Sequence, residues 1–230
     1  PAGGTAMPDL ASPSTTASAA KAPVVFVGYG VNAPDWNDYA DLDVAGQTVI
    51  ALINDPGWGN QDPNLFKGPA LTYYGRWTYK FEEAARRGAA ALFIVHETGG
   101  AGYPWSVVEN GWTGPQFSLP SSEVPAPRLD AAGWLREDAA THRFASAGAD
   151  FASLKKSADI PGFKPVALDA KLSVSFRSGI ESASSENVVG MLPGSERPDE
   201  AVFYTAHWDH LGKDESLTGD QIYNGAIDNA

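Results

Sequence analysis

Compact apolar runs alternate with polar, glycine-rich stretches along the first part of the chain. Residues 23–30 (PVVFVGYG) and 47–55 (QTVIALIND) combine β-branched and aromatic side chains and end at glycine or just before proline. Each run therefore predicts a strand. Between them lies a turn-rich acidic segment at 33–44 (APDWNDYADLDV).

Residues 78–97 change from a helical to a strand-like pattern. Phe81, Ala84 and Ala85 recur at helical spacing, whereas 91–95 is a short continuous apolar run. The pattern predicts a helix followed by a strand that is buried on both faces. Alternation of strand, helix and strand is typical of a mixed α/β domain.

The patterns after this strand are weaker and then change in kind. Residues 99–127 are rich in Gly, Pro and Trp and predict a loop, whereas 130–140 and 149–156 predict helices. Residues 158–169 (ADIPGFKPVALD) predict a connection between domains. Three further strands are predicted beyond it, at KLSVSFR (171–177), NVVGMLPG (187–194) and AVFYTAH (201–207).

These patterns predict an α/β protein with three parts. Residues 1–22 are rich in Ala, Ser, Thr, Pro and Gly and predict a flexible lead-in. We expect 23–162 to form an α+β domain with a mixed sheet and flanking helices. Residues 163–230 then supply the first strands of a second domain, with an α/β mixed sheet.

Composition narrows the classes of partner and cofactor. Among 230 residues, 28 Asp and Glu face 16 Lys and Arg, and the net charge of −12 argues against nucleic acid or anionic membrane as a partner. Cysteine is absent, so a metal would need imidazole and carboxylate ligands. No apolar run is long enough to span a membrane. The first residues lack the pattern of a signal peptide, and we expect the chain to be an internal fragment of a longer protein.

The segment YTAHWDHLG (204–212) gathers the residue types of a metal site. His207 follows an apolar run, and in a continuing strand its side chain and that of Asp209 point the same way. Such a pair is either a metal site or an ordinary hydrogen-bonded pair. His210 faces the other way and is expected at the rim. Asp228, in the later segment DQIYNGAIDNA, is a further carboxylate that could bridge two cations.

AVFYTAHWDHLG followed by DQIYNGAIDNA resembles the di-zinc metallopeptidase superfamily of aminopeptidases, glutamate carboxypeptidases and transferrin-receptor-like proteins. The resemblance implies that His207 is a terminal zinc (Zn) ligand and that Asp228 bridges two zincs. It also implies that Asp209 is a catalytic-site carboxylate that orients His207. SENVVGMLPGS, just upstream, is similar to the family's approach to this site.

Further upstream, VVFVGYGVNAPDWNDYADLDVAGQTVIALINDPG, YYGRWTYKFEEAARRGAAALFIVHET and AGYPWSVVENG resemble a protease-associated (PA) domain inserted in one branch of this superfamily. The resemblance implies a non-catalytic PA domain at 23–162, which shapes substrate access, and the N-terminal part of a zinc peptidase domain at 163–230.

The resemblance implies a secreted or periplasmic hydrolase, a zinc-dependent exopeptidase of the aminopeptidase type acting on peptide substrates. The family places a Glu-Glu pair, a further carboxylate and a final histidine after the bridging aspartate, and here only Asn229 and Ala230 follow. We therefore expect this chain to be inactive alone. The alternatives are a non-catalytic, receptor-like relative and a PA-type module for protein–protein interaction.

Other clusters have simpler interpretations. The aromatic run at 73–79 (YYGRWTY) is expected to pack a domain interface rather than contact substrate. Glu82 and Glu83 are expected on a solvated helix face. His96 and His142 are expected to be surface or locally bonded histidines. The four aspartates of the acidic segment lack the spacing of a calcium loop and predict a solvated turn; they are Asp35, Asp38, Asp41 and Asp43.

Overall fold

A computed structural model describes residues 17–120, 122–176, 179–207, 210, 212–213 and 215–226. The chain divides into two compact units, Pro1–Glu181 and Ser182–Ala230. Among the described residues, no helix is long and apolar enough to cross a membrane. Residues 1–16, which fall in the predicted lead-in, lie outside the described part, as do Asp209 and Asp228.

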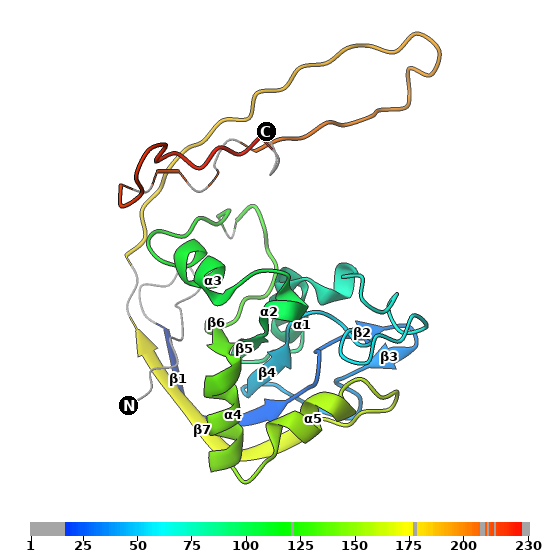
Figure 1. Ribbon diagram of the computed structural model, residues 1–230, viewed down its shortest axis with the longest axis vertical. Coiled ribbons are helices and arrows are strands. Elements are labelled where there is room, and N and C mark those ends of the chain that lie inside the picture. The colour runs from blue at the N-terminus through cyan, green and yellow to red at the C-terminus, as the bar shows by residue number, and fades with distance from the viewer. Residues whose placement is uncertain are drawn as a thin grey trace. The chain divides into compact units, whose positions relative to one another are not determined.

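The first unit is built on a five-stranded mixed sheet with the strand order β6-β5-β4-β1-β7 (Figure 1). Four neighbouring strands are parallel, and β7 pairs antiparallel with β1 at the edge. The strands are β1 (Ala17–Phe26), β4 (Thr48–Leu52), β5 (Ala91–His96), β6 (Ala131–Arg136) and β7 (Val166–Phe176). A two-residue pair, β2 (Asn32–Ala33) with β3 (Trp36–Asn37), forms a separate hairpin. The predicted α/β class is confirmed.

The central strands form because their side chains are apolar on both faces. Every residue of β4 (TVIAL) and of β5 (ALFIVH) is buried. This is the pattern of parallel strands that are covered by helices on both sides. The strands predicted at 47–55 and 91–95 are therefore confirmed.

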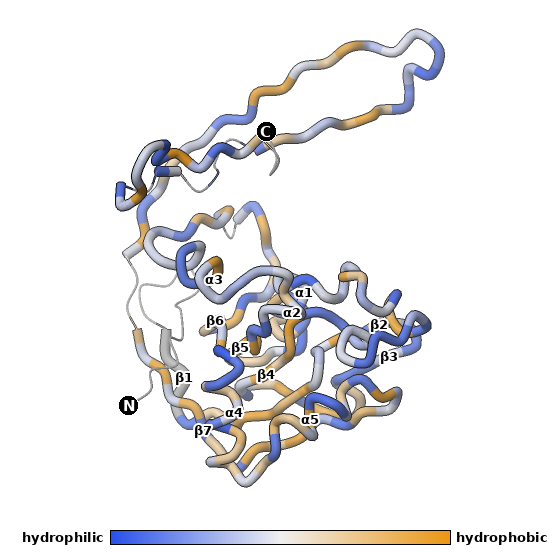
Figure 2. Tube along the Cα trace, in the orientation of Figure 1, coloured by the Kyte–Doolittle hydropathy of each residue, from blue (hydrophilic) through white to orange (hydrophobic). Residues whose placement is uncertain are grey.

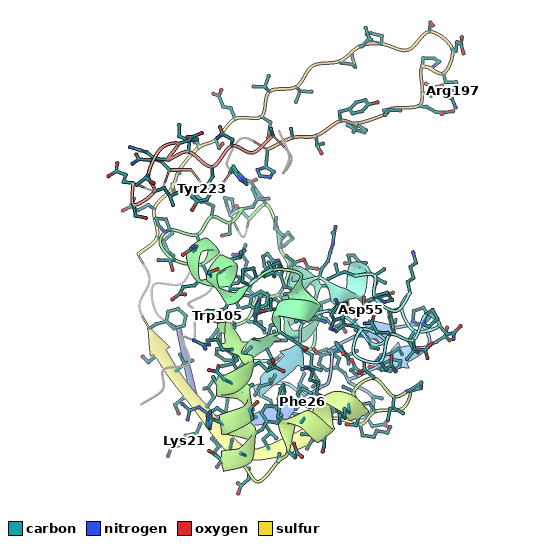
Figure 3. All side chains as sticks on the ribbon, viewed as in Figure 1. Lys21, Phe26, Asp55, Trp105, Arg197 and Tyr223 are labelled. Atoms are coloured by element: carbon teal, nitrogen blue, oxygen red, sulfur yellow. The ribbon has the colours of Figure 1, made fainter. Side chains whose placement is uncertain are left out.

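Helices cover the two faces of the sheet. Helix α1 (Trp77–Arg86) packs Phe81, Ala84 and Ala85 on one face, as its spacing predicted. On the other face, Phe26 of β1, which Figure 3 labels, lies against α4 (Glu137–Ser146) and α5 (Phe151–Ser157). Its ring meets those of Phe144 and Phe151 edge-on, with ring centroids 5.3 and 6.4 Å apart. The remaining helical elements are η1 (Tyr73–Gly75), α2 (Thr98–Ala101) and α3 (Trp105–Gly111).

Three sequence predictions in the first unit are wrong in part. Residues 131–136, predicted as helix, form strand β6 because they pair in parallel with β5, and the helix α4 begins only at Glu137. The predicted loop at 99–127 contains α3 and most of α2. Strand β1 begins at Ala17, inside the expected lead-in, because it pairs with the end of β7.

Strand β7 sets the end of the first unit. Its residues pair with β1 from Ala17↔Phe176 to Phe26↔Val166. The residues 171–176, which the sequence analysis assigns to a second domain, therefore lie in the sheet of the first unit. The division between the units falls at Glu181, beyond the boundary expected at 162/163.

The second unit is extended in its described part. Residues 187–194 and 201–207, predicted as strands, form neither helix nor strand there, and Val188, Leu192 and Tyr204 are 98%, 95% and 96% exposed. Hydrophobic and hydrophilic stretches alternate along this segment (Figure 2). A strand needs a neighbouring strand for its backbone N–H and C=O groups, and among the described residues neither 187–194 nor 201–206 is paired in a sheet. Further along, a single bridge joins Lys213 to Ile222.

Candidate functional site

His207 is the one predicted metal-site residue that the structure describes. It stands at the end of the extended segment 201–207 of the second unit, and it is exposed. Its ring lies 6.3 Å from that of His210, centroid to centroid, with the planes inclined by 43°. The chain therefore brings these two imidazoles near each other, whereas strand alternation had placed His210 away from the site. The positions of Asp209 and Asp228 fall outside the described residues, so their predicted roles stay predictions.

The donor types of this segment suit zinc, because imidazole and carboxylate are ligands that zinc accepts. Within the described ranges, no group of three or more His, Cys, Asp or Glu side chains is placed to hold a metal ion. The described residues therefore supply a histidine of the right chemistry but not a complete coordination shell.

The other two histidines have local roles. His96, at the end of β5, is buried, and its Nε2 lies 3.0 Å from the carbonyl oxygen of Tyr103. Burial lowers the pKa of His96, which favours the neutral imidazole. His142 is exposed on α4. The prediction of surface or locally bonded histidines is confirmed.

A lysine that the sequence pattern did not single out is buried at the centre of the first unit. The Lys80 side chain on α1 is fully buried, and its Nζ donates to the carbonyl oxygens of Tyr29 at 2.6 Å and Tyr74 at 3.3 Å. Burial lowers the pKa of Lys80 to about 7, although the carboxyl groups of Asp38 and Asp55 act in the opposite direction. Lys80 thus joins α1 to the loop after β1 and to η1.

Asp38 is buried rather than solvated, so this part of the acidic-turn prediction is wrong. Its Oδ2 accepts a hydrogen bond from the Val31 N–H at 2.9 Å, and its Oδ1 accepts one from the Trp36 indole at 2.6 Å. Burial raises the pKa of Asp38 to about 7 against the effect of these donors. The carboxyl group thus links the backbone just before β2 to the Trp36 side chain of β3. Asp35, Asp41 and Asp43 are exposed, as predicted.

Asp55 follows β4 at the carboxyl edge of the parallel strands, where ligands of open α/β sheets commonly bind. Its Oδ2 accepts from the backbone N–H and the hydroxyl of Thr72, at 2.9 and 2.6 Å. Its Oδ1 has no hydrogen-bond partner among the described residues, and burial raises its pKa. The sequence signal that could have identified Asp55 is its place at the end of the apolar strand pattern at 47–55.

Glu83 also differs from its prediction. It is buried, and it accepts hydrogen bonds from Arg86 at 3.0 Å and from Arg87 at 2.7 Å. The same carboxylate accepts from the Asn32 amide at 3.1 Å, which links α1 to β2. Glu83 therefore anchors the helix, and only Glu82 lies on the solvated face.

The aromatic run at 73–79 packs mainly against its own unit. The rings of Tyr73 and Tyr74 each meet the ring of Tyr79 edge-on, at centroid distances of 5.3 and 5.2 Å. Trp77 continues into the core, 5.6 Å from the ring of Trp112. These contacts hold the run against the first unit, where Tyr79 is buried and Tyr73 stays 57% exposed.

The decisive comparison falls on the segment that holds His207. Residues 187–230 match the sequence model of peptidase family M28. The match includes His207, Asp209 and Asp228, and it supports the resemblance to the di-zinc aminopeptidase superfamily.

Comparisons with solved structures and with curated proteins give weaker similarity or none. The chain is similar to the solved structure of an aminopeptidase from Aneurinibacillus sp. strain AM-1, with 17% identity and a TM-score of 0.28. This similarity covers 73% of the present chain, which spans only 28% of the chain of that aminopeptidase. No curated protein matches the sequence significantly.

Proposed function

We propose that this chain acts as part of a zinc-dependent exopeptidase of the aminopeptidase type, with two co-catalytic zincs and peptides as substrates. The observation that carries the proposal is the M28 match at 187–230, which spans all three residues of the predicted metal site. An extracellular or periplasmic location belongs to the same proposal and rests on the family resemblance.

Each residue of the site has a distinct proposed role. His207 binds one zinc through its imidazole, Asp228 bridges both zincs, and Asp209 accepts a hydrogen bond from His207 and so fixes its orientation. Bound zinc would supply a Lewis acid that polarises a peptide carbonyl and acidifies a water molecule. The donor types fit this role.

The residues upstream of the proposed metal site are assigned to substrate access. In this proposal 23–162 is the PA domain, which shapes access to the peptidase site. The Glu-Glu pair that the family places after the bridging aspartate is not among these 230 residues. We therefore propose that the 230-residue chain by itself hydrolyses no peptide, because it lacks that general base.

Zinc titration of the 230-residue chain, followed by imidazole NMR signals, tests the metal site apart from activity. We expect the His207 signals to shift on zinc addition and to recover with a chelator, with weak binding because few ligands are present. Signals of His142 should stay unchanged, and His207→Ala should abolish the response whereas His142→Ala should not. A response centred on His142, or none at His207, contradicts the proposed ligand.

A separate assay tests the proposed inactivity. The chain is incubated with zinc and a set of aminoacyl p-nitroanilides, and we expect no release of nitroaniline. Hydrolysis that a chelator abolishes and that His207→Ala removes would show that these residues suffice for catalysis. That result would overturn the proposal that the general base is missing, while leaving the peptidase function itself supported.

A further inference from the structure

A cavity of about 410 Å³ lies on the face of the sheet that α4 covers, between that helix and β7. Its apolar lining includes side chains from three strands of the sheet, with Ile50 of β4, Phe93 of β5, and Leu168 and Leu172 of β7. A volume of this size is typical of small-molecule sites, which are mostly apolar with a few placed polar groups. All of its lining residues belong to the first unit, so an inference about it is independent of the proposed peptidase site.

Thr48 supplies an unused hydrogen-bonding group in this cavity. It is the first residue of β4, lines the cavity and is only 1% exposed. Its hydroxyl Oγ1 has no hydrogen-bond partner within the described part of the chain. Buried hydroxyl groups in folded proteins are normally hydrogen-bonded, so the Thr48 hydroxyl is a polar group of this cavity wall whose hydrogen-bonding capacity the described residues leave unused.

A cationic group lies at the same end of the cavity. Helix α4 follows β6 directly and runs back along the sheet, so its last turn lies toward the start of the parallel strands, where Thr48 stands. Arg143 and Ser146 of this turn line the cavity, and Arg143 is exposed at its mouth. No ion pair of Arg143 is found among the residues that the structure describes.

The other charged groups at the mouth offset each other. Asp169 and Lys171 alternate with Leu168 and Leu172 along β7, so their side chains leave the strand together on its exposed side. One negative and one positive charge there leave the guanidinium of Arg143 as the unbalanced charge. The cavity thus combines an apolar body with a hydroxyl donor and a cation at one end.

We propose that this cavity binds a small amphipathic carboxylic acid. The carboxylate accepts hydrogen bonds from the Thr48 hydroxyl and the Arg143 guanidinium, which are charge-assisted and therefore strong. The hydrocarbon part lies against Ile50, Phe93 and Leu172, where its burial is favourable. A neutral alcohol or an ammonium compound with the same chain lacks the negative charge that Arg143 complements.

Octanoate serves as the probe, in calorimetric titrations of the 230-residue chain, with 1-octanol and acetate as matched controls. We expect one saturable site for octanoate and roughly tenfold weaker binding of 1-octanol, which lacks the charge, and of acetate, which lacks the chain. Thr48→Val keeps the shape of the side chain and should weaken octanoate binding several-fold. Arg143→Gln should do the same, whereas Lys67→Gln, which removes an exposed charge outside the cavity, should have no effect.

Thermal unfolding shows whether each variant is folded, and Thr48→Val should melt no lower than the parent chain because it removes an unpaired buried hydroxyl. The proposal is overturned by the absence of saturable octanoate binding, by equal affinity for 1-octanol, or by binding that Thr48→Val and Arg143→Gln leave unchanged.

Discussion

The side-chain nitrogen of Lys80 lies 2.6 Å from the carbonyl oxygen of Tyr29, in a region from which water is excluded. The contact holds helix α1 against the loop that follows β1. A lysine that is fully buried loses the solvation of its charge, and its pKa falls to about 7 for that reason. Nearby, the buried Asp38 has its pKa raised to about 7 by the same cause. The stability of the first unit should therefore depend strongly on pH.

Lys80 should make the protein more stable as the pH rises from neutral. Its pKa is about 7 in the folded protein, against 10.5 as the ordinary value, so the unfolded chain binds more protons between these two limits. The free energy of unfolding should increase by about 3 kcal/mol between pH 7 and 9.5. Denaturant unfolding at a series of pH values measures this rise, and Lys80→Met should remove it.

The exposed Lys156 of α5 provides the matched control, since Lys156→Met should leave the rise in place. Parallel curves for the parent chain and Lys80→Met would show that the lysine is not the group responsible.

Asp38 should act in the opposite direction at lower pH. Its folded pKa of about 7 lies above its ordinary value of 3.8, so the folded state holds a proton that the unfolded chain releases. The stability that this group contributes is complete below pH 3.8 and is lost as the pH rises through 7. The free energy of unfolding should fall by about 2.5 kcal/mol between pH 4.5 and 6.5.

Asp38→Asn should abolish this fall, and the same pH series of denaturant melts measures it. The variant should also be less stable at pH 4.5, since an amide nitrogen would face either the Val31 N–H or the Trp36 indole, both of which are donors. Asp35→Asn, at an exposed position of the same segment, should keep the parent curve. If Asp35→Asn and Asp38→Asn behave alike, the assignment to the buried carboxyl is wrong.

The hydroxyl of Tyr29 should contribute to stability through Asp159. It donates to Asp159 Oδ1 over 3.0 Å and so joins the loop after β1 to the segment after α5. Tyr29→Phe should lower the free energy of unfolding by about 1 to 2 kcal/mol, because a buried hydrogen bond to a carboxylate is lost. Asp159 keeps its bond from the Gly57 N–H, at 3.2 Å, which limits the loss.

Tyr73→Phe removes a hydroxyl from an exposed tyrosine and should change the midpoint of unfolding little. An equal loss in both variants would mean that the Tyr29–Asp159 bond is not the cause.

Replacing Gly57 by alanine should destabilise the protein more than the same change at Gly46, although both glycines have a positive φ. Gly57 has φ +94° and Gly46 has φ +69°, so alanine is strained at both. A Cβ at Gly57 would also overlap the carbonyl oxygen of Leu65, whereas at Gly46 it would meet nothing within 4 Å. We expect Gly46→Ala to cost about 1 kcal/mol and Gly57→Ala at least about 2 kcal/mol more. Equal melting temperatures for the two variants would refute the steric argument.

The local sequence pattern predicted the central strands and α1 because the apolar residues of these elements recur at the spacing of the faces that they bury. β5 is apolar from Ala91 to Val95, and α1 turns Phe81, Ala84 and Ala85 to one side. The segment 131–136 was harder, because AAGWLR has no strand alternation and its alanines favour helix. Pairing with β5 decided its conformation, and a contact so distant in sequence is not visible in a local window.

The buried charges could not be predicted for a related reason. Lys80 and Glu83 sit among charged neighbours on a helix that looks solvated on that side, and only the packing of η1 and β2 against α1 encloses them. The metal-site prediction rests on motif order rather than on geometry. Of its three residues the structure describes His207, and the family match supports the motif as a whole.

The pairing of β1 with β7 has a mechanical consequence. Ala17 and Phe176 lie opposite each other, so the chain enters and leaves the first unit at one point (Figure 1). A pulling force applied at Ala17 and Phe176 would act in an unzipping geometry. It would break the hydrogen bonds between β1 and β7 one after another and not all at once. The β1–β7 pair would then separate at low force while the parallel strands β4, β5 and β6 stay paired. Unfolding of the first unit would begin at the Ala17–Phe176 end of this pair.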